Sequence, residues 1–417
     1  MIHETAETCS IHGTMDDREI EAMSGPDLFD TLLRIHGAET LGREYVFVRL
    51  ARMNVAGHLD YSEISRILQQ IRRRADWFGV WMDASQRHQS LAAAAEALEA
   101  WASAGDGYLR ASLCAHWASL YAPGNLKSVA HQRSVELYLA GSNWYQPSCQ
   151  RVEIPFGDDV LPGYLRRGNP DASHSIVIML GGADTNKEEL HHWSTQFARR
   201  GLAVLAMDGP GQGEHAARYG RLTMRLDDYH AAVSAAIDWL QTHISSGQTQ
   251  RFGLFGNSLG GYLALDAAMR DGRIGAVISN GGFCDGASMA SWPDGVMNAF
   301  ASCLGITDFD QIRHHLREHL DLTRVPGDHR PSALVVHGGR EDLTDEAESR
   351  RAAELVDGTL VVIPDGWHTC TNRDHLMSPL FGDWVMRALR GDVTGGFREV
   401  RIEDERGYAT LFGEGNN

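Results

Sequence analysis

The sequence lacks the marks of a secreted or membrane-spanning protein. Its 417 residues include only six cysteines, which are scattered and form no CxxC pair, so reduced thiols are expected. No apolar run approaches the roughly 18 to 20 residues of a membrane span. The N-terminal stretch MIHETAETCSIHGTMDD has neither the cations nor the apolar core of a signal peptide. These absences predict a cytoplasmic protein.

Positive charge is also scarce. The chain has 38 lysines and arginines against 55 aspartates and glutamates, a net charge of −17 with histidine neutral. Binding to nucleic acid or to an anionic membrane needs clustered cations, so neither is an expected partner. With 43% apolar and 22% charged residues the chain can bury a sizeable core, and its length favours a main domain with an additional module.

Two regions of the chain differ in their hydrophobic pattern. Up to about residue 150, stretches such as YSEISRILQQIRRRADWFGVW repeat apolar residues every three or four positions, which predicts a helical domain over residues 1–150. Short apolar runs then alternate with helical stretches: RVEIPF, SIVIML, LAVLAMD, RFGLF, GAVISN, SALVVHG and TLVVIP. This alternation predicts a mainly parallel sheet covered by helices over residues 151–395. The remaining residues, 396–417, form a C-terminal extension that adds a strand or trails off.

A candidate nucleophile lies between a predicted strand and a predicted helix. The strand RFGLF leads into GNSLGG, which places Ser258 on a sharp turn with glycines two residues before and two after it. A tight strand-to-helix turn needs such small neighbours. The G-x-S-x-G pattern is weak alone, but in this context it indicates a nucleophile elbow rather than an ordinary glycine-rich turn.

A serine hydroxyl needs a base, and the base needs an acid that orients it. His368 follows the last strongly apolar run, TLVVIP, at a strand end where such sheets place reacting groups. In this kind of fold the acid comes between serine and histidine, after the preceding strand SALVVHG. The stretch HGGREDLTD offers two neighbouring carboxylates there, Glu341 and Asp342.

An oxyanion hole requires two backbone N–H groups. We expect one from Leu259, after the nucleophile, and one from the loop IMLGGADTNKEE, supplied by Ala183 with Gly182 beside it. In the same loop, Thr185-x-x-Glu188 matches a helix capping box, which gives Glu188 a structural role.

Two other motifs suggest bound groups but fit poorly. His315-x-x-Glu318-His319 spells an inverted zinc-peptidase motif, yet it lies in an amphipathic stretch, DFDQIRHHLREHLDL, without a downstream ligand helix, so a solvated helix face is favoured. MDGPGQGE departs from a dinucleotide loop, because Glu214 stands where glycine is needed, and favours a rigid turn. We expect neither metal nor cofactor.

The motifs IMLGGADTNKEE, AMDGPGQGE, GNSLGGYLAL, SNGGFCD and PDGWHTC together resemble the α/β-hydrolase group typified by 2,6-dihydroxypseudooxynicotine hydrolase and by fungal pigment hydrolases that shorten polyketides. The similarity covers about residues 110 to 390. It implies a mainly parallel eight-stranded sheet flanked by helices, an N-terminal all-helical cap domain, and pairing as a homodimer. One residue departs from the group's pattern: Asn257 precedes the serine, where arginine is frequent.

The resemblance also bears on the acid and the reaction. Counting four residues from His337, as in a shorter version of the loop, leads to Glu341, whereas one extra residue in the Gly-Gly turn leads to Asp342. The spacing from Asp342 to the next helix matches the family better. Asp342 is therefore the expected acid, and Glu341 is the reserve. The implied reaction is cleavage of a carbon–carbon bond beside a ketone by Ser258, His368 and this acid.

Several reactions are compatible with the same residues. The leading hypothesis is a hydrolase of a 1,3-diketone or acyl-phenol, in secondary metabolism or aromatic degradation. A carboxylesterase or lactonase would use the same parts, as would an acyltransferase or cyclase of natural-product biosynthesis. A non-catalytic protein that binds a ligand in a covered pocket is a further alternative. In each case the partner is a small ketone or ester, aromatic or polyketide-like.

Overall fold

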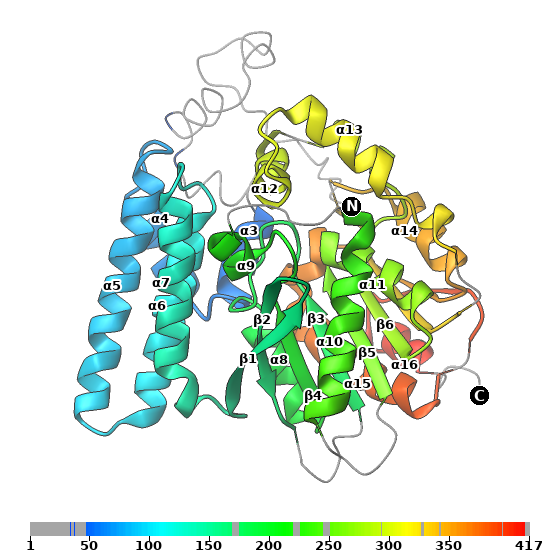
Figure 1. Ribbon diagram of the computed structural model, residues 1–417, viewed down its shortest axis with the longest axis horizontal. Coiled ribbons are helices and arrows are strands. Elements are labelled where there is room, and N and C mark those ends of the chain that lie inside the picture. Colours follow the sequence, from blue (N-terminus) through cyan, green and yellow to red (C-terminus); the bar gives the residue numbers. More distant parts are fainter. Residues whose placement is uncertain are drawn as a thin grey trace, which may run out of the picture.

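A nine-stranded sheet runs through the computed structural model of the chain (Figure 1). The structure describes residues 34, 37, 47–168, 175–219, 226–244, 251–292, 294–326, 329–341, 343–393 and 395–412. The strand order is β1-β2-β4-β3-β5-β6-β7-β8-β9. Pairing is antiparallel between β1 and β2 and between β2 and β4, and parallel from β4 to β9. The α/β-hydrolase fold expected from the motifs is confirmed.

Each of the seven apolar runs forms a strand, and two further strands complete the sheet. The strands are β1 (Cys149–Phe156), β2 (Asp159–Arg166), β3 (Ser175–Leu180), β4 (Ala203–Met207), β5 (Arg251–Asn257), β6 (Ile274–Asn280), β7 (Ser332–Gly338), β8 (Thr359–Ile363) and β9 (Arg398–Arg401). The sheet therefore has one strand more than the expected eight. The stretch DVLPGYLR of β2 is a poor strand by sequence, because Pro162 cannot donate to a ladder. The extension supplies β9, which pairs with β8.

Helices cover both faces of the sheet, because each face presents a continuous apolar surface. On one face lie α10 (Tyr229–His243), α11 (Leu259–Arg270) and α14 (Glu346–Leu355); on the other lie α8 (His191–Arg199) and α15 (Asp374–Arg390). Side chains of β3 alternate between the two cores, with Ile176 and Ile178 in one and Val177 and Met179 in the other. This period of two is expected for a strand buried on both faces.

The region before β1 is helical, and no strand occurs among its described residues, 47–148. It contains α3 (Phe47–Val55), α4 (Tyr61–Leu68), α5 (Asp76–Ala97), α6 (Trp101–Ser119) and α7 (Leu126–Gly141). Helices α4 to α7 form a bundle beside the sheet (Figure 1) around their own core, which includes the buried Trp81 and Trp117. The division of the chain at residues 150 and 395 into separate domains stays a prediction.

The remaining helices connect strands or end the chain. They are α9 (Gly213–Tyr219) after β4, α12 (Asp294–Leu304) and α13 (Phe309–His319) between β6 and β7, and α16 (Glu405–Leu411) after β9. Across the part of the chain that the structure describes, none of the helices combines the length and apolar character needed to cross a bilayer.

Candidate active site

Ser258 occupies a strained turn between β5 and α11. Its φ of 55° and ψ of −121° lie in a region that a residue with a side chain rarely adopts. A Cβ at Gly256 would lie 1.9 Å from the carbonyl oxygen of Gly260, and one at Gly260 would lie 2.4 Å from that of Leu180. Only glycine fits at these two positions. The turn therefore holds the serine side chain out of the helix and strand, as the G-x-S-x-G pattern predicts.

The imidazole of His368 lies beside this serine. His368 follows β8, and its Nε2 is 2.9 Å from Ser258 Oγ. The two residues after it, Thr369 and Cys370, have φ values of 61° and 52°, so the chain turns sharply directly after the histidine. The structure thus brings together two residues that are 110 positions apart in the sequence.

The carboxylate that meets His368 is that of Glu341. Its Oε1 forms a hydrogen bond with His368 Nδ1, and the Glu341 side chain is fully buried. The N–H of Glu341 donates to the carbonyl of Gly338 at 2.9 Å, which closes a tight turn at the end of β7. This turn leaves no extra residue before the acid. The geometry therefore favours Glu341 over Asp342, which lies outside the described residues.

The start of the loop after β7 packs directly on the loop that carries His368. Gly339 N–H donates to the carbonyl of Ile363 at 2.7 Å, and Arg340 N–H donates to that of Gly366 at 2.8 Å. A Cβ at Gly338 would lie 2.3 Å from the carbonyl oxygen of Trp367. The Gly-Gly pair thus serves the close approach of the acid loop to the histidine loop.

The loop after β3 passes next to the serine. A Cβ at Gly182 would lie 3.3 Å from the Cβ of Ser258, which places the Gly181-Gly182 pair against the turn. Ala183 follows and is half-buried, while Leu259 begins α11 directly after the serine. Gly182 thus packs against Ser258, and Ala183 and Leu259 directly follow these two residues in the chain. Their roles as oxyanion donors stay a prediction.

Gln212 fixes this loop, and sequence reasoning missed it. Its Nε2 donates to the carbonyls of Gly181 and Gly182 at 2.9 and 3.0 Å, and its Oε1 accepts from the Tyr229 hydroxyl at 2.7 Å. With both carbonyls engaged by one amide, the peptide planes of the loop have a set orientation. The only signal in the sequence was the MDGPGQGE motif, interpreted as a rigid turn.

Replacing Gln212 with leucine should lower kcat by about 10-fold to 100-fold, because a misoriented oxyanion loop loses part of the 10²- to 10³-fold effect of one donor. Steady-state kinetics with any ester that the protein hydrolyses would measure the loss in kcat. Tyr229→Phe is the matched control, since it removes one bond to Gln212 but keeps both carbonyl contacts; its loss should be smaller. An unchanged kcat in folded Gln212→Leu would refute a positioning role.

Asn280, at the end of β6, links the serine turn to the histidine loop. Its Nδ2 donates to Asn257 Oδ1 and to the carbonyl of Thr369, both at 2.9 Å. Its own carbonyl accepts from Ser258 N–H at 2.8 Å. The residue that departs from the family pattern, Asn257, is thus 6% exposed and engaged in a side-chain hydrogen bond. Through these bonds Asn280 holds the turn that carries Ser258 and the loop that carries His368 at a fixed distance from each other.

A buried group of charges lies behind the loop after β3. Lys187 Nζ lies 2.9 Å from Glu188, 3.0 Å from Asp208 and 2.9 Å from Glu214. Burial alone would lower the pKa of Lys187, but the three carboxylates outweigh it and raise that pKa. The Tyr164 hydroxyl donates to Glu188 at 2.7 Å.

The capping box expected at Thr185 and Glu188 is wrong. Helix α8 begins only at His191, with Leu190 at its N-cap and no side-chain capping bond. The carboxylate of Glu188 instead contacts Lys187 and Tyr164. Its role is structural, but through burial of charge and not through a helix end.

A second buried group joins the N-terminal helices to the same loop. Arg52 of α3 donates to Glu189 and, at 3.0 Å, to Asp184, while His116 Nε2 of α6 lies 2.8 Å from Glu189. Burial tends to raise the pKa of Glu189, but the guanidinium of Arg52 lowers it below the ordinary value. Because Asp184 and Glu189 flank Lys187, helices from before residue 120 reach the loop beside Ser258.

The histidines of the zinc-like motif lie on α13, a helix as expected. The rings of His315 and His319 are 4.3 Å apart between centroids, and His319 lies 3.5 Å from Asp227. Among the residues that the structure describes, no group of three or more histidine, cysteine, aspartate or glutamate side chains is arranged to hold a metal ion.

The chain is similar to known hydrolases in sequence. The family model described as serine aminopeptidase, S33 (Hydrolase_4) matches residues 171–307. The 2,6-dihydropseudooxynicotine hydrolase of Paenarthrobacter nicotinovorans is 29% identical over 317 residues, which are 75% of this chain and 84% of that protein. The 20-hydroxy-prefusarin hydrolase of Gibberella moniliformis is 34% identical over 225 residues, 50% of this chain and 52% of that protein.

A solved structure is similar over most of its length. The crystal structure of 2,6-dihydroxy-pseudo-oxynicotine hydrolase superposes with a TM-score of 0.74 and 27% sequence identity, covering 84% of this chain and 98% of that one. The fungal relative matches over only about half its length. The region before β1 is therefore part of the similarity to the solved structure.

Proposed function

Because this chain is a hydrolase of the α/β-hydrolase family, we propose that it cleaves a carbon–carbon bond beside a ketone, with Ser258, His368 and Glu341 as its triad. The observation that carries the proposal is the continuous hydrogen bonding from Ser258 Oγ through both nitrogens of His368 to Glu341. Similarity to 2,6-dihydropseudooxynicotine hydrolase over three quarters of the chain favours a ketone substrate of the 1,3-diketone or acyl-phenol type.

In the first step His368 accepts the proton of Ser258, and the serine oxygen attacks the substrate ketone. Glu341 stabilises the imidazolium that forms and keeps Nε2 directed at the serine. The resulting alkoxide would accept hydrogen bonds from the N–H groups of Leu259 and Ala183. Loss of one such donor costs about 2.7 to 4 kcal/mol of barrier, so this contact supplies a large part of the rate.

In the second step the tetrahedral intermediate collapses. The carbon–carbon bond breaks, and its electron pair leaves with the carbon that bears a second carbonyl or a hydroxylated ring, where the charge delocalises. His368 returns its proton to that carbon. Water, activated by the same histidine, then hydrolyses the acyl-serine. With an alkoxide as leaving group, the same steps would describe an esterase.

Two measurements test the proposal. A fluorophosphonate probe should label the wild-type protein at Ser258 and fail to label Ser258→Ala, because only an activated serine reacts. Turnover of a 1,3-diketone and acyl-phenol panel should then exceed turnover of simple aryl esters. Efficient ester cleavage with no ketone cleavage would overturn the carbon–carbon assignment, and a folded wild-type protein that binds ketones but is not labelled would be a ligand-binding protein. The homodimer and the cytoplasmic location stay predictions.

A further inference from the structure

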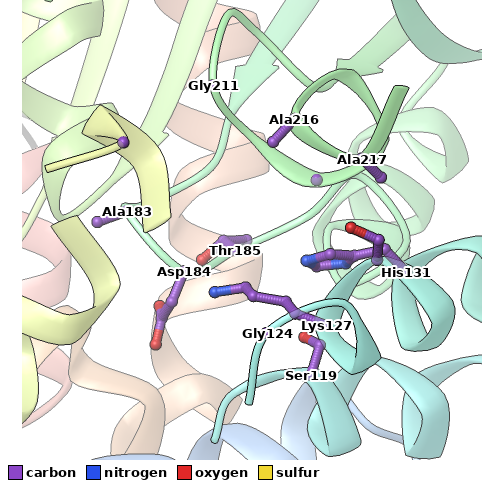
Figure 2. Close-up of a pocket in the computed structure, with 13 residues that line it drawn as sticks. Ser119, Gly124, Lys127, His131, Ala183, Asp184, Thr185, Gly211, Ala216 and Ala217 are labelled. Carbon is purple, nitrogen blue, oxygen red and sulfur yellow. The ribbon is translucent and has the colours of Figure 1, made fainter. Parts of the chain in front are cut away.

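A cavity of about 200 Å³ lies between the N-terminal helices and the loop that follows β3 (Figure 2). Helices α6 and α7 contribute one wall, and the loops after β3 and β4 together with helix α9 contribute the other. The polar side chains that line it are those of Ser119, Lys127, Ser128, His131, Asp184 and Thr185, and Ala183 lines it beside them. None of the proposed steps above uses the side chains from α6 and α7.

The position of the cavity relates it to the reaction. Ala183, one of its lining residues, follows Gly182, whose Cβ position lies 3.3 Å from that of Ser258. A substrate whose ketone carbon is on Ser258 and whose oxygen faces Ala183 thus has this cavity as its neighbour. The cavity is suited to hold a part of the substrate close to the scissile bond.

The acceptors in the cavity wall are already engaged. Asp184 Oδ1 accepts from Arg52 at 3.0 Å, and Thr185 Oγ1 accepts from the same guanidinium at 3.1 Å. The hydroxyl of Ser119 donates to the carbonyl of His116 at 2.7 Å. These bonds supply Asp184 and Thr185 with a protein donor, and they commit the Ser119 hydrogen to a protein acceptor.

The donors in the wall have capacity left. Lys127 is half-buried in the first turn of α7, and Figure 2 shows its ammonium directed into the space beside Asp184. An ammonium carries three N–H groups, so it can keep one neighbour and still donate to a ligand. His131 is only 8% exposed, and its Nδ1 has no hydrogen-bond partner among the described residues.

His131 is held neutral in this site. Burial lowers its pKa well below the ordinary value, and the charge of Lys127 adds to the effect. A neutral imidazole has one N–H donor and one acceptor nitrogen. Leaving a buried polar atom without a partner is unfavourable, so a ligand oxygen or hydroxyl that contacts this ring would relieve an existing cost. Lys127 and His131 lie four residues apart on one helix, so they face the same space.

We propose that this cavity binds the oxygen on which the leaving group collects its negative charge, an enolate or phenolate oxygen, with Lys127 as its ionic partner and His131 as its hydrogen-bonding partner. The inference rests on the proposed carbon–carbon cleavage. When the bond breaks, the electron pair delocalises from carbon onto that oxygen before His368 protonates the carbon. The protein then provides two separate sites for negative charge, the backbone N–H groups for the acyl part and Lys127 for the leaving part.

The test separates binding from turnover. In a Ser258→Ala background, which cannot react, cyclohexane-1,3-dione is the probe, because it exists as an enolate at neutral pH. Its neutral methyl enol ether, 3-methoxycyclohex-2-enone, is the matched control. Isothermal titration should show tighter binding of the enolate. Lys127→Met should weaken enolate binding by about 10-fold to 100-fold and leave the ether unchanged, and Lys127→Arg should restore part of the loss.

A spectroscopic readout locates the probe. The chain has two lysines, Lys127 and Lys187, and the second is fully buried. Reductive methylation with ¹³C-formaldehyde should therefore mark Lys127 and the chain's amino terminus, and the Lys127 signal should shift with the enolate and not with the ether. Equal affinity for the two probes, or an unchanged preference in Lys127→Met, would overturn the proposal. The two proposals can also fail separately. If the wild type turns over only esters but Lys127→Met still loses enolate binding, the binding site is supported and the carbon–carbon reaction is refuted.

Discussion

Replacing Glu341 with glutamine should lower kcat by about 10⁴-fold, the effect expected when the acid of a serine triad becomes an amide. The carboxylate accepts from His368 Nδ1, which leaves Nε2 free to accept the proton of Ser258. An amide can instead donate to Nδ1, and the imidazole then carries its proton on Nε2, where it cannot act as a base. Burst kinetics with an activated aryl ester would measure the loss in the acylation step.

Asp342→Asn is the matched control for this prediction. It makes the same chemical change at the neighbouring residue, and it should leave kcat within a small factor of the wild-type value. Circular dichroism and melting temperature of both variants would establish that each is folded. A 10⁴-fold loss in Asp342→Asn together with an active Glu341→Gln would restore the assignment expected from loop length.

Replacing Lys187 with methionine should destabilise the protein by about 3 to 5 kcal/mol, the cost of removing one partner from a buried ionic group. Three carboxylates, those of Glu188, Asp208 and Glu214, lose their shared cation. Among the described ion pairs only Glu214 keeps other cations, Arg151 and Arg218. Thermal and urea unfolding would measure the loss. Lys127→Met removes the other lysine from a half-buried helix position and should change stability by less than about 0.5 kcal/mol.

The pH dependence of the stability of Lys187→Met gives a second readout. Burial already raises the pKa of Glu188, and without Lys187 that pKa should rise further. A carboxyl whose pKa is raised in the folded state binds more protons there than in the unfolded state, so stability increases as pH falls. The stability difference between wild type and Lys187→Met should therefore shrink from about pH 8 to about pH 5.5. A difference that grew toward low pH would contradict a loss caused by unpaired carboxylates.

In the wild type, Glu214 of the same buried group makes stability depend on pH in the opposite direction. Burial tends to raise the pKa of Glu214, but Lys187 and Arg151 lower it from 4.5 to about 2. A depressed pKa gives stability that is present above the unfolded value and lost as pH falls through the folded one. The contribution of Glu214 should therefore disappear only between about pH 4.5 and about pH 2.

Local patterns predicted the parts of the site that depend on local structure. Ser258 follows from glycine spacing between a strand and a helix, and His368 from its place after a buried strand. The seven apolar runs all form strands, because burial on both faces of a sheet requires such runs. Strand β2 was missed for the same reason, since Pro162 and Gly163 interrupt its pattern while distant neighbours still pair with it.

The features that sequence did not reveal depend on contacts between distant segments. The choice between Glu341 and Asp342 follows from the turn that Ile363 and Gly366 impose on the acid loop, 22 or more residues later. Gln212 contacts Gly181 and Gly182 across 31 and 30 positions, and Glu188, in the loop after β3, has a partner in Tyr164 on β2. In the sequence each of these residues resembles an ordinary turn or capping residue, because its partner becomes a neighbour only when the sheet forms.

The salt bridges from Arg52 to Asp184 and Glu189 limit how such a protein can be recombined. A helical region that carries a neutral residue at the place of Arg52 would leave Asp184 and Glu189, in the loop after β3, without this guanidinium. Exchange of the whole N-terminal region would need the loop after β3 to be exchanged with it. The unit that can be exchanged is therefore the helices together with this loop, although Arg52 and the loop are separated by more than 120 residues in the chain.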